Sequence, residues 1–179
     1  MSIESAHYIN VILGIGTILL QVLTLGTLLL LIFKKENKFL SFVKKYFIEI
    51  GFLLSFSGVL ISSFYSEVLN YLPCFHCWIQ RIFMFPQAIL FGVAWLKRDR
   101  NVFWYSLPLT LLGLADAIYL IYIYYFNINA APCDASGVSC AVHYVYEFGG
   151  YISIPSISIT GFVAMLSLLA VVYFYKKEE

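Results

Sequence analysis

Long apolar segments separated by shorter polar ones dominate the hydrophobic pattern of this chain. Five of them cover roughly residues 10–33, 47–66, 79–96, 103–126 and 157–175. Each approaches or exceeds the roughly 18 to 20 residues that a helix needs to cross the hydrocarbon core of a bilayer. A helix also satisfies its own backbone hydrogen bonds, which lipid cannot do. The pattern therefore predicts five transmembrane helices.

The composition also indicates that lipid is the main solvent of this chain. Of 179 residues, 61% are hydrophobic and 12% are charged, whereas about 25% are charged in an ordinary soluble domain. We therefore expect an all-α integral membrane protein. A four-helix transmembrane bundle is expected over residues 46–179. One additional N-terminal transmembrane helix and a basic cytoplasmic linker are expected over residues 1–45.

The first apolar segment has one alternative interpretation, a cleavable signal peptide. Residues 1–10 contain no basic residue, and the apolar run that follows is longer than the hydrophobic core of a signal peptide. We therefore expect this segment to remain as a helix of the mature protein.

Basic residues are distributed unevenly among the connecting segments. Ten of the eleven lie between the first and second spans, between the third and fourth, or after the fifth: Lys34, Lys35, Lys38, Lys44, Lys45, Lys97, Arg98, Arg100, Lys176 and Lys177. By the positive-inside rule these segments face the cytoplasm. The N-terminus, residues 67–78 and residues 127–156 then face outside, and all four cysteines lie in the last two segments.

The first cysteine pair forms a C-x-x-C unit, Cys74-Phe75-His76-Cys77, which Pro73 precedes and an apolar segment follows. Both thiols are therefore expected at a helix N-terminus. Unpaired N–H groups and the positive end of the helix dipole stabilise a thiolate there, and the thiolate is the reactive form in disulfide exchange. A close pair in such an exposed position suits repeated oxidation and reduction better than permanent cross-linking.

Arg81 is the remaining basic residue, four positions after Cys77 and hence on the same helix face one turn deeper. An arginine inside a span is by default a functional hypothesis. Its cation can stabilise a Cys77 thiolate or the oxygen of a bound quinone, and snorkelling to the lipid headgroups is the structural alternative. Gln80 is a candidate neutral hydrogen-bond partner at the same place, with interhelical packing as its alternative.

The second cysteine pair, Cys133 and Cys140, lies in the longer outer segment with six residues between the two cysteines. This spacing permits a local disulfide. Neither pair joins two helices, so a purely structural role would be a poor use of both. A non-enzymatic membrane protein with two static disulfides or a four-cysteine zinc site is the alternative. The spacing of the second pair is wider than is usual for zinc ligands.

Two cysteine pairs only pass electrons along, so a net oxidant needs a terminal electron acceptor. A quinone dissolved in the bilayer meets this requirement. The sequence contains no haem, flavin or iron–sulfur motif, and no metal or nucleic acid is expected as a ligand.

Two further residues carry open interpretations, and one segment carries a weaker prediction. Asp116 lies near the middle of the fourth apolar segment, where a carboxyl group must be protonated, paired or in a polar cavity. A proton path to reduced quinone and an ordinary interhelical hydrogen bond both remain open for it. His76 is expected to tune the thiol potential rather than to bind metal. Apolar residues within 142–148 can form one edge of a short helix on the membrane surface.

Two stretches of the sequence resemble the DsbB family of disulfide-bond formation proteins. The first is PCFHCWIQR at residues 73–81, followed by an apolar helix. The second is PCDASGVSC at residues 132–140, continuing to FGGYISIP at residues 148–155, and it resembles the Gram-positive BdbC branch in particular. The resemblance covers roughly residues 46–175, and family members usually have four spans, so the first span is an addition.

The resemblance implies a quinone-dependent protein disulfide oxidoreductase in the bacterial cytoplasmic membrane. An extracytoplasmic thioredoxin-fold protein of the DsbA or BdbD kind would reduce the Cys133/Cys140 disulfide, with Cys133 forming the mixed disulfide. Cys74 would exchange with this second pair. Cys77 would be the thiol nearest to the quinone, ubiquinone or menaquinone, with Arg81 as its electrostatic companion.

Overall fold

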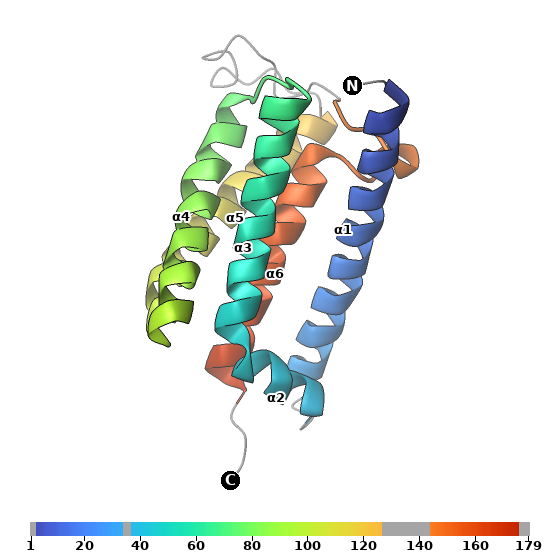
Figure 1. Ribbon diagram of the computed structural model, residues 1–179. Coiled ribbons are helices and arrows are strands. Elements are labelled where there is room, and N and C mark those ends of the chain that lie inside the picture. Colours follow the sequence, from blue (N-terminus) through green and yellow to red (C-terminus); the bar gives the residue numbers. More distant parts are fainter. Residues whose placement is uncertain (1–2, 34–36, 127–143, 176–179) are drawn as a thin grey trace.

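The computed structural model describes residues 3–33, 37–126 and 144–175 (Figure 1). Cys133 and Cys140 lie outside these ranges. Within them, five helices are long and apolar enough to cross a membrane. They are α1 (Ile3–Ile32), α3 (Phe47–Ser63) extended by the π-helical turn η1 (Phe64–Val68), α4 (Phe75–Lys97), α5 (Val102–Phe126) and α6 (Ile154–Phe174). The chain is an all-α integral membrane protein, as its hydrophobic pattern predicted.

Helices α3, α4, α5 and α6 form an antiparallel bundle in which each helix packs against the next and α3 also packs against α6. Helix α1 lies outside this bundle, alongside α6 (Figure 1). The beginnings of α1, α4 and α6 and the ends of α3 and α5 share one end of the molecule. The C-x-x-C unit at the start of α4 therefore lies at that end.

Two glycines let neighbouring helices of the bundle approach closely. A Cβ atom on Gly51 would come within 2.4 Å of the Phe91 ring on α4, and one on Gly113 within 2.2 Å of the Phe162 ring on α6. Both rings are almost fully buried. Lipid tails are as apolar as the side chains, so close packing rather than hydrophobicity holds transmembrane helices together. Gly51 and Gly113 are therefore packing positions.

Part of the segment expected as a linker is helical. Helix α2 (Lys38–Lys45) begins after Asn37, whose side chain accepts a hydrogen bond from the Phe39 N–H at 3.1 Å. Leu40 and Val43 are buried, and α2 crosses the end of the molecule opposite the cysteine pair (Figure 1). Two turns give too short a period to be recognised from sequence, which explains why α2 was missed.

The surface helix expected within residues 142–148 is wrong for the described part of that segment. Glu147 and Ile152 pair as an isolated antiparallel bridge around the 3₁₀ turn η3 (Phe148–Gly150), whose residues have positive φ angles of 52°, 69° and 87°. Val145 is buried against Tyr65 instead of facing lipid. The two glycines of η3 readily adopt this left-handed backbone, which ends a helix rather than continuing one.

Candidate functional site

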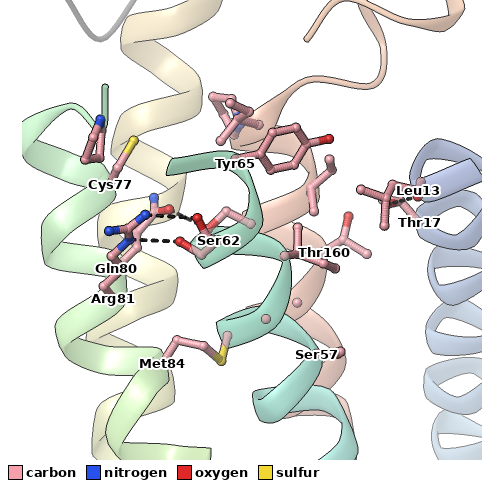
Figure 2. Close-up of a pocket in the computed structure, with 18 of the residues that line it drawn as sticks. Leu13, Thr17, Ser57, Ser62, Tyr65, Cys77, Gln80, Arg81, Met84 and Thr160 are labelled. Atoms are coloured by element: carbon pink, nitrogen blue, oxygen red, sulfur yellow. Dashed lines mark hydrogen bonds between the residues drawn. The ribbon is translucent and has the colours of Figure 1, made fainter. Parts of the chain in front are cut away.

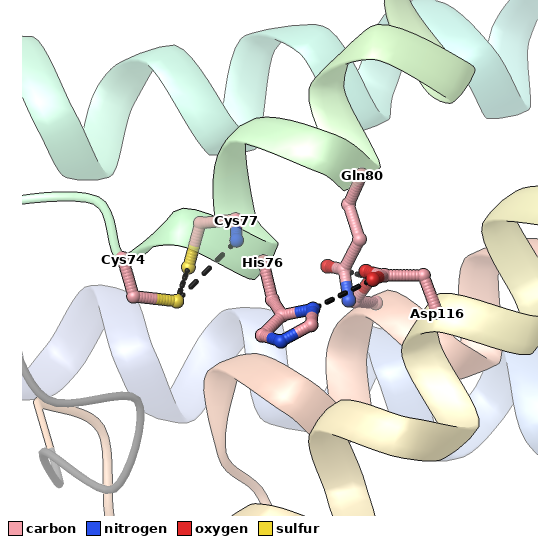
Figure 3. Close-up of polar contacts among 6 residues, drawn as sticks. Cys74, His76, Cys77, Gln80 and Asp116 are labelled. Atoms are coloured by element: carbon pink, nitrogen blue, oxygen red, sulfur yellow. Dashed lines mark hydrogen bonds and ion pairs between the residues drawn. The ribbon is translucent and has the colours of Figure 1, made fainter. Parts of the chain in front are cut away.

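The cysteine pair lies at the first turn of α4. Cys74 is the N-cap residue, in an extended conformation, and its Sγ accepts a hydrogen bond from the Cys77 N–H at 3.3 Å. The two Sγ atoms lie 2.7 Å apart, and both cysteines are free (Figure 3). The third span begins earlier than predicted, at Phe75, so Cys77 is inside the helix. Both thiols are at a helix N-terminus, close enough to form a bond with little movement.

The surroundings of Cys74 favour its thiolate, as expected for a thiol at a helix N-terminus. Its pKa is lowered from the ordinary value, chiefly because the Cys77 side chain hydrogen-bonds to its sulfur. The backbone N–H groups of Cys77 and His76 lower it further, whereas burial and the negative charge of Asp116 act in the opposite direction. The thiolate is the attacking species in disulfide exchange, so a lowered pKa makes Cys74 the better candidate nucleophile.

Arg81 is held inside the bundle by α3. Its Nε donates to the Ser62 Oγ at 2.9 Å and its Nη2 to the Ser62 carbonyl oxygen at 3.0 Å. The guanidinium carbon lies 5.0 Å from the centre of the Trp78 ring and 5.9 Å from that of Phe85. A side chain that snorkels to the headgroups would not be tied to a neighbouring helix in this way, so the snorkelling alternative does not fit this geometry.

A cavity of about 490 Å³ adjoins the cysteine pair and lies between α1, α3, α4 and α6 (Figure 2). Most of its lining is apolar, and its volume falls within the usual range for a small-molecule site, about 300 to 1,000 Å³. Four of the predicted site residues come together on its α4 side: Cys74, Cys77, Gln80 and Arg81. Cys133 and Cys140 lie outside the described residues.

Gln80 lines this cavity and carries a buried donor without a partner among the described residues. Its Oε1 accepts a hydrogen bond from the Ser158 Oγ on α6 at 2.6 Å. Its Nε2 is buried and has no hydrogen-bond partner among the residues that the structure describes. A buried donor in that state needs a water or a ligand, because leaving it unpaired costs about 1 to 3 kcal/mol.

A buried acid–base pair lies behind the cysteines. The His76 Nδ1 and the Asp116 Oδ1 are 2.6 Å apart, and the two side chains are 6% and 11% exposed (Figure 3). Asp116 is therefore paired, one of the three states that its position in the span allowed. The other polar atoms, His76 Nε2 and Asp116 Oδ2, have no partner in the described part of the chain.

Sequence reasoning missed the side chains that α3 and α6 contribute. Ser62 and Ser158 fix Arg81 and Gln80, and Tyr65 and Tyr71 line the outer part of the cavity as a stacked pair. Serines in apolar segments were a usable signal, but their partners depend on helix packing. Among the described residues, no three His, Cys, Asp or Glu side chains group together as metal ligands.

Multiple membrane-spanning helices, a free C-x-x-C pair at a helix N-terminus and an adjoining apolar cavity define a membrane thiol–disulfide oxidoreductase. The chain belongs to the DsbB family: the family model described as "Disulfide bond formation protein DsbB" matches residues 44–172. The function of the protein in the membrane is disulfide-bond formation. Helix α1 lies outside the matched region.

Several curated relatives carry names that agree with this assignment. The chain is 37% identical over 130 residues to "Probable disulfide formation protein C 2" of Bacillus cereus, covering 73% of this chain and 93% of that protein. It is 33% identical over 138 residues to "Probable disulfide formation protein" of Chlamydia pneumoniae, covering 76% and 98%. A Bacillus subtilis relative, "SPbeta prophage-derived disulfide bond formation protein B", is 35% identical over 127 residues, covering 71% and 84%. No solved structure matches the chain significantly.

Proposed function

We propose that this protein reoxidises an extracytoplasmic thioredoxin-fold dithiol oxidase and passes the electrons to a membrane quinone. The observation that carries this proposal is that Cys74 and Cys77 line the same apolar cavity as Arg81 and Gln80. A redox-active pair next to a cavity of this kind suits an apolar electron acceptor from the bilayer. Membership of the DsbB family supports disulfide formation as the overall reaction.

The proposed path begins at the second cysteine pair. A thiolate of the partner attacks the Cys133–Cys140 disulfide at Cys133, and Cys140 leaves as a thiolate. The second thiol of the partner then displaces Cys133, so the partner gains a disulfide and this pair becomes a dithiol. The dithiol next reduces the Cys74–Cys77 disulfide by the same two exchanges. Each stage moves two electrons and two protons, and no other oxidant is required.

The residues that line the cavity fit a quinone. A quinone is an apolar ring with two carbonyl oxygens, and the cavity offers apolar walls and the cation of Arg81, with Gln80 beside it in the lining. Arg81 and Gln80 would hold a carbonyl oxygen on the side of the cavity that Cys77 lines. When bound, a quinone accepts the two electrons and two protons that the Cys74/Cys77 dithiol releases as its S–S bond forms. The apolar walls exclude water from this exchange.

We also propose that the protein lies in the bacterial cytoplasmic membrane with its cysteines facing outside. Apart from Arg81, the described basic residues belong to α2, to the last turn of α4 or to the α4–α5 connection, at the end of the molecule opposite Cys74. The positive-inside rule places that end in the cytoplasm and the cysteines outside. In this description, residues 46–179 are the redox domain, and residues 1–45 add one span and a basic segment to it.

The direct test is a complete catalytic cycle in lipid nanodiscs with a reduced thioredoxin-fold oxidase and menaquinone or ubiquinone. We expect one quinol for each disulfide formed in the partner. A Cys74→Ser variant should lose quinone reduction but still oxidise about one equivalent of partner, because Cys133/Cys140 can act once. Four cysteines that stay unreactive toward the partner would support the alternative, a non-enzymatic protein with static disulfides or a zinc site.

A further inference from the structure

Helix α1 is outside the region that matches the DsbB family, yet it forms one wall of the candidate quinone cavity. The family match begins at residue 44, and α1 ends at Ile32. Figure 2 shows α1 on the side of the cavity away from α4, which carries Cys77. Five residues spaced along one face of α1 line the cavity: Ile12, Leu13, Gly16, Thr17 and Leu20.

Hydrogen bonds to the bundle fix the position of this wall. The Tyr65 hydroxyl donates to the Asn10 Oδ1 at 2.9 Å, and Asn10 is 6% exposed. Further along α1, the Gln21 Nε2 donates to the Thr160 Oγ1 at 2.9 Å, and the Tyr151 hydroxyl donates to the Gln21 Oε1 at 2.8 Å. These bonds lie on either side of the cavity-lining residues, so α1 cannot slide or turn without breaking them.

The α1 wall offers space and apolar contact but no hydrogen-bond donor. A Cβ atom added at Gly16 would meet no atom within 4 Å, so the helix surface is open at this point. The Thr17 hydroxyl donates to the Leu13 carbonyl oxygen at 2.8 Å and is thereby occupied. Gln80 and Arg81 line the cavity from α4, opposite α1, together with Ser62 of α3 and Ser158 of α6, which hydrogen-bond to them. The cavity therefore has a polar side for a headgroup and an apolar side against α1.

We propose that α1 is the wall against which the apolar tail of the acceptor lies, and that the open space beside Gly16 accommodates this tail. This inference rests on the proposed function. A tail in the bilayer is already in apolar surroundings, so contact with α1 gains little hydrophobic free energy. The affinity therefore depends on whether the tail fits sterically against α1, and the open surface at Gly16 provides the space for it.

The test fills the space at Gly16 and compares two acceptors. In nanodiscs, the KM for a long-chain menaquinone should rise about tenfold in Gly16→Phe, which corresponds to about 1.4 kcal/mol, whereas the KM for tail-less menadione should change by less than about twofold. Gly16→Ala and Gly16→Leu should give intermediate increases. Gly26→Phe is the matched control, because a Cβ there also meets no atom within 4 Å and Gly26 does not line the cavity.

Each result separates this inference from the proposed function. Oxidation of about two equivalents of partner, one for each cysteine pair and neither needing quinone, confirms that a variant is folded. Equal increases for both acceptors, or no increase for the long-chain one in any Gly16 variant, would overturn the role of α1 while leaving quinone reduction intact. If the unmodified protein reduces neither acceptor, the proposed function fails and this inference fails with it.

Discussion

At the scale of single residues, the two thiols of the C-x-x-C unit are chemically unequal. Cys74 is the N-cap of α4 and receives hydrogen bonds on its sulfur, whereas Cys77 is one turn into the helix and lines the cavity above Arg81. This inequality suits a relay, because one thiol can exchange with another protein segment while the other serves an acceptor in the membrane. The proposed function accordingly assigns separate roles to Cys74 and Cys77.

Two substitutions should shift the pKa of Cys74 in opposite directions. Cys77→Ala removes the hydrogen bond that does most to lower this pKa, so the pKa should rise toward its ordinary value. Asp116→Asn removes a negative charge that raises it, so the pKa should fall. The rate of alkylation by iodoacetamide, measured against pH in reduced protein with Cys133 and Cys140 replaced by serine, reports both. Shifts of the same sign would contradict the assignment.

Arg81→Ala should weaken acceptor binding without affecting the second cysteine pair. The cation and its two hydrogen bonds to Ser62 are lost together, and the KM for long-chain and tail-less quinones should rise alike, by about tenfold, or about 1.4 kcal/mol. Steady-state quinone reduction measures this, and single-turnover oxidation of the partner serves as the control for folding. Unchanged kinetics with both acceptors would remove Arg81 from the site.

Among the helices and turns, close contacts between helices contribute more to the stability of the bundle than hydrophobicity does. Gly113 faces the buried Phe162 ring across the α5–α6 contact. Gly113→Ala should therefore lower the free energy of unfolding by about 1 to 3 kcal/mol through overpacking. Gly26→Ala adds the same methyl group into open space and should be neutral or slightly stabilising, because alanine favours a helix. Unfolding in mixed micelles compares the two, and equal losses would contradict the packing assignment.

The sequence could predict the transmembrane helices but not the hydrogen bonds between them. All five spans follow from the length of apolar runs, since a lipid-exposed helix needs apolar residues on every side. The third span was predicted from residue 79, whereas α4 begins at Phe75, where the cap at Cys74 and the first backbone hydrogen bonds of the helix already form. The bonds from Arg81 to Ser62 and from Ser158 to Gln80 join residues far apart in sequence, and only the packing of the bundle brings them together.

At the scale of the whole molecule, the chain is a four-helix bundle with an added helix that encloses an apolar cavity. Apart from Arg81, the described basic residues lie at one end. There the Lys44 Nζ donates to the Tyr175 carbonyl oxygen and the Arg100 Nη2 to the Lys44 carbonyl oxygen, and these hydrogen bonds join α2 to its neighbours. The cysteine pair lies at the other end, beside the cavity. This arrangement suits the proposed exchange of electrons between a thiol pair at one end of the molecule and an acceptor dissolved in the membrane.

Transfer of electrons from Cys74 and Cys77 to a quinone is the step on which this account depends, and a single turnover can isolate it. Fully reduced protein carrying Cys133→Ser and Cys140→Ser is mixed with quinone in nanodiscs without oxygen, and quinol absorbance and free thiols are followed together. We expect one quinol per protein molecule and a new disulfide between Cys74 and Cys77. Quinone that stays oxidised while both thiols remain free would contradict the account.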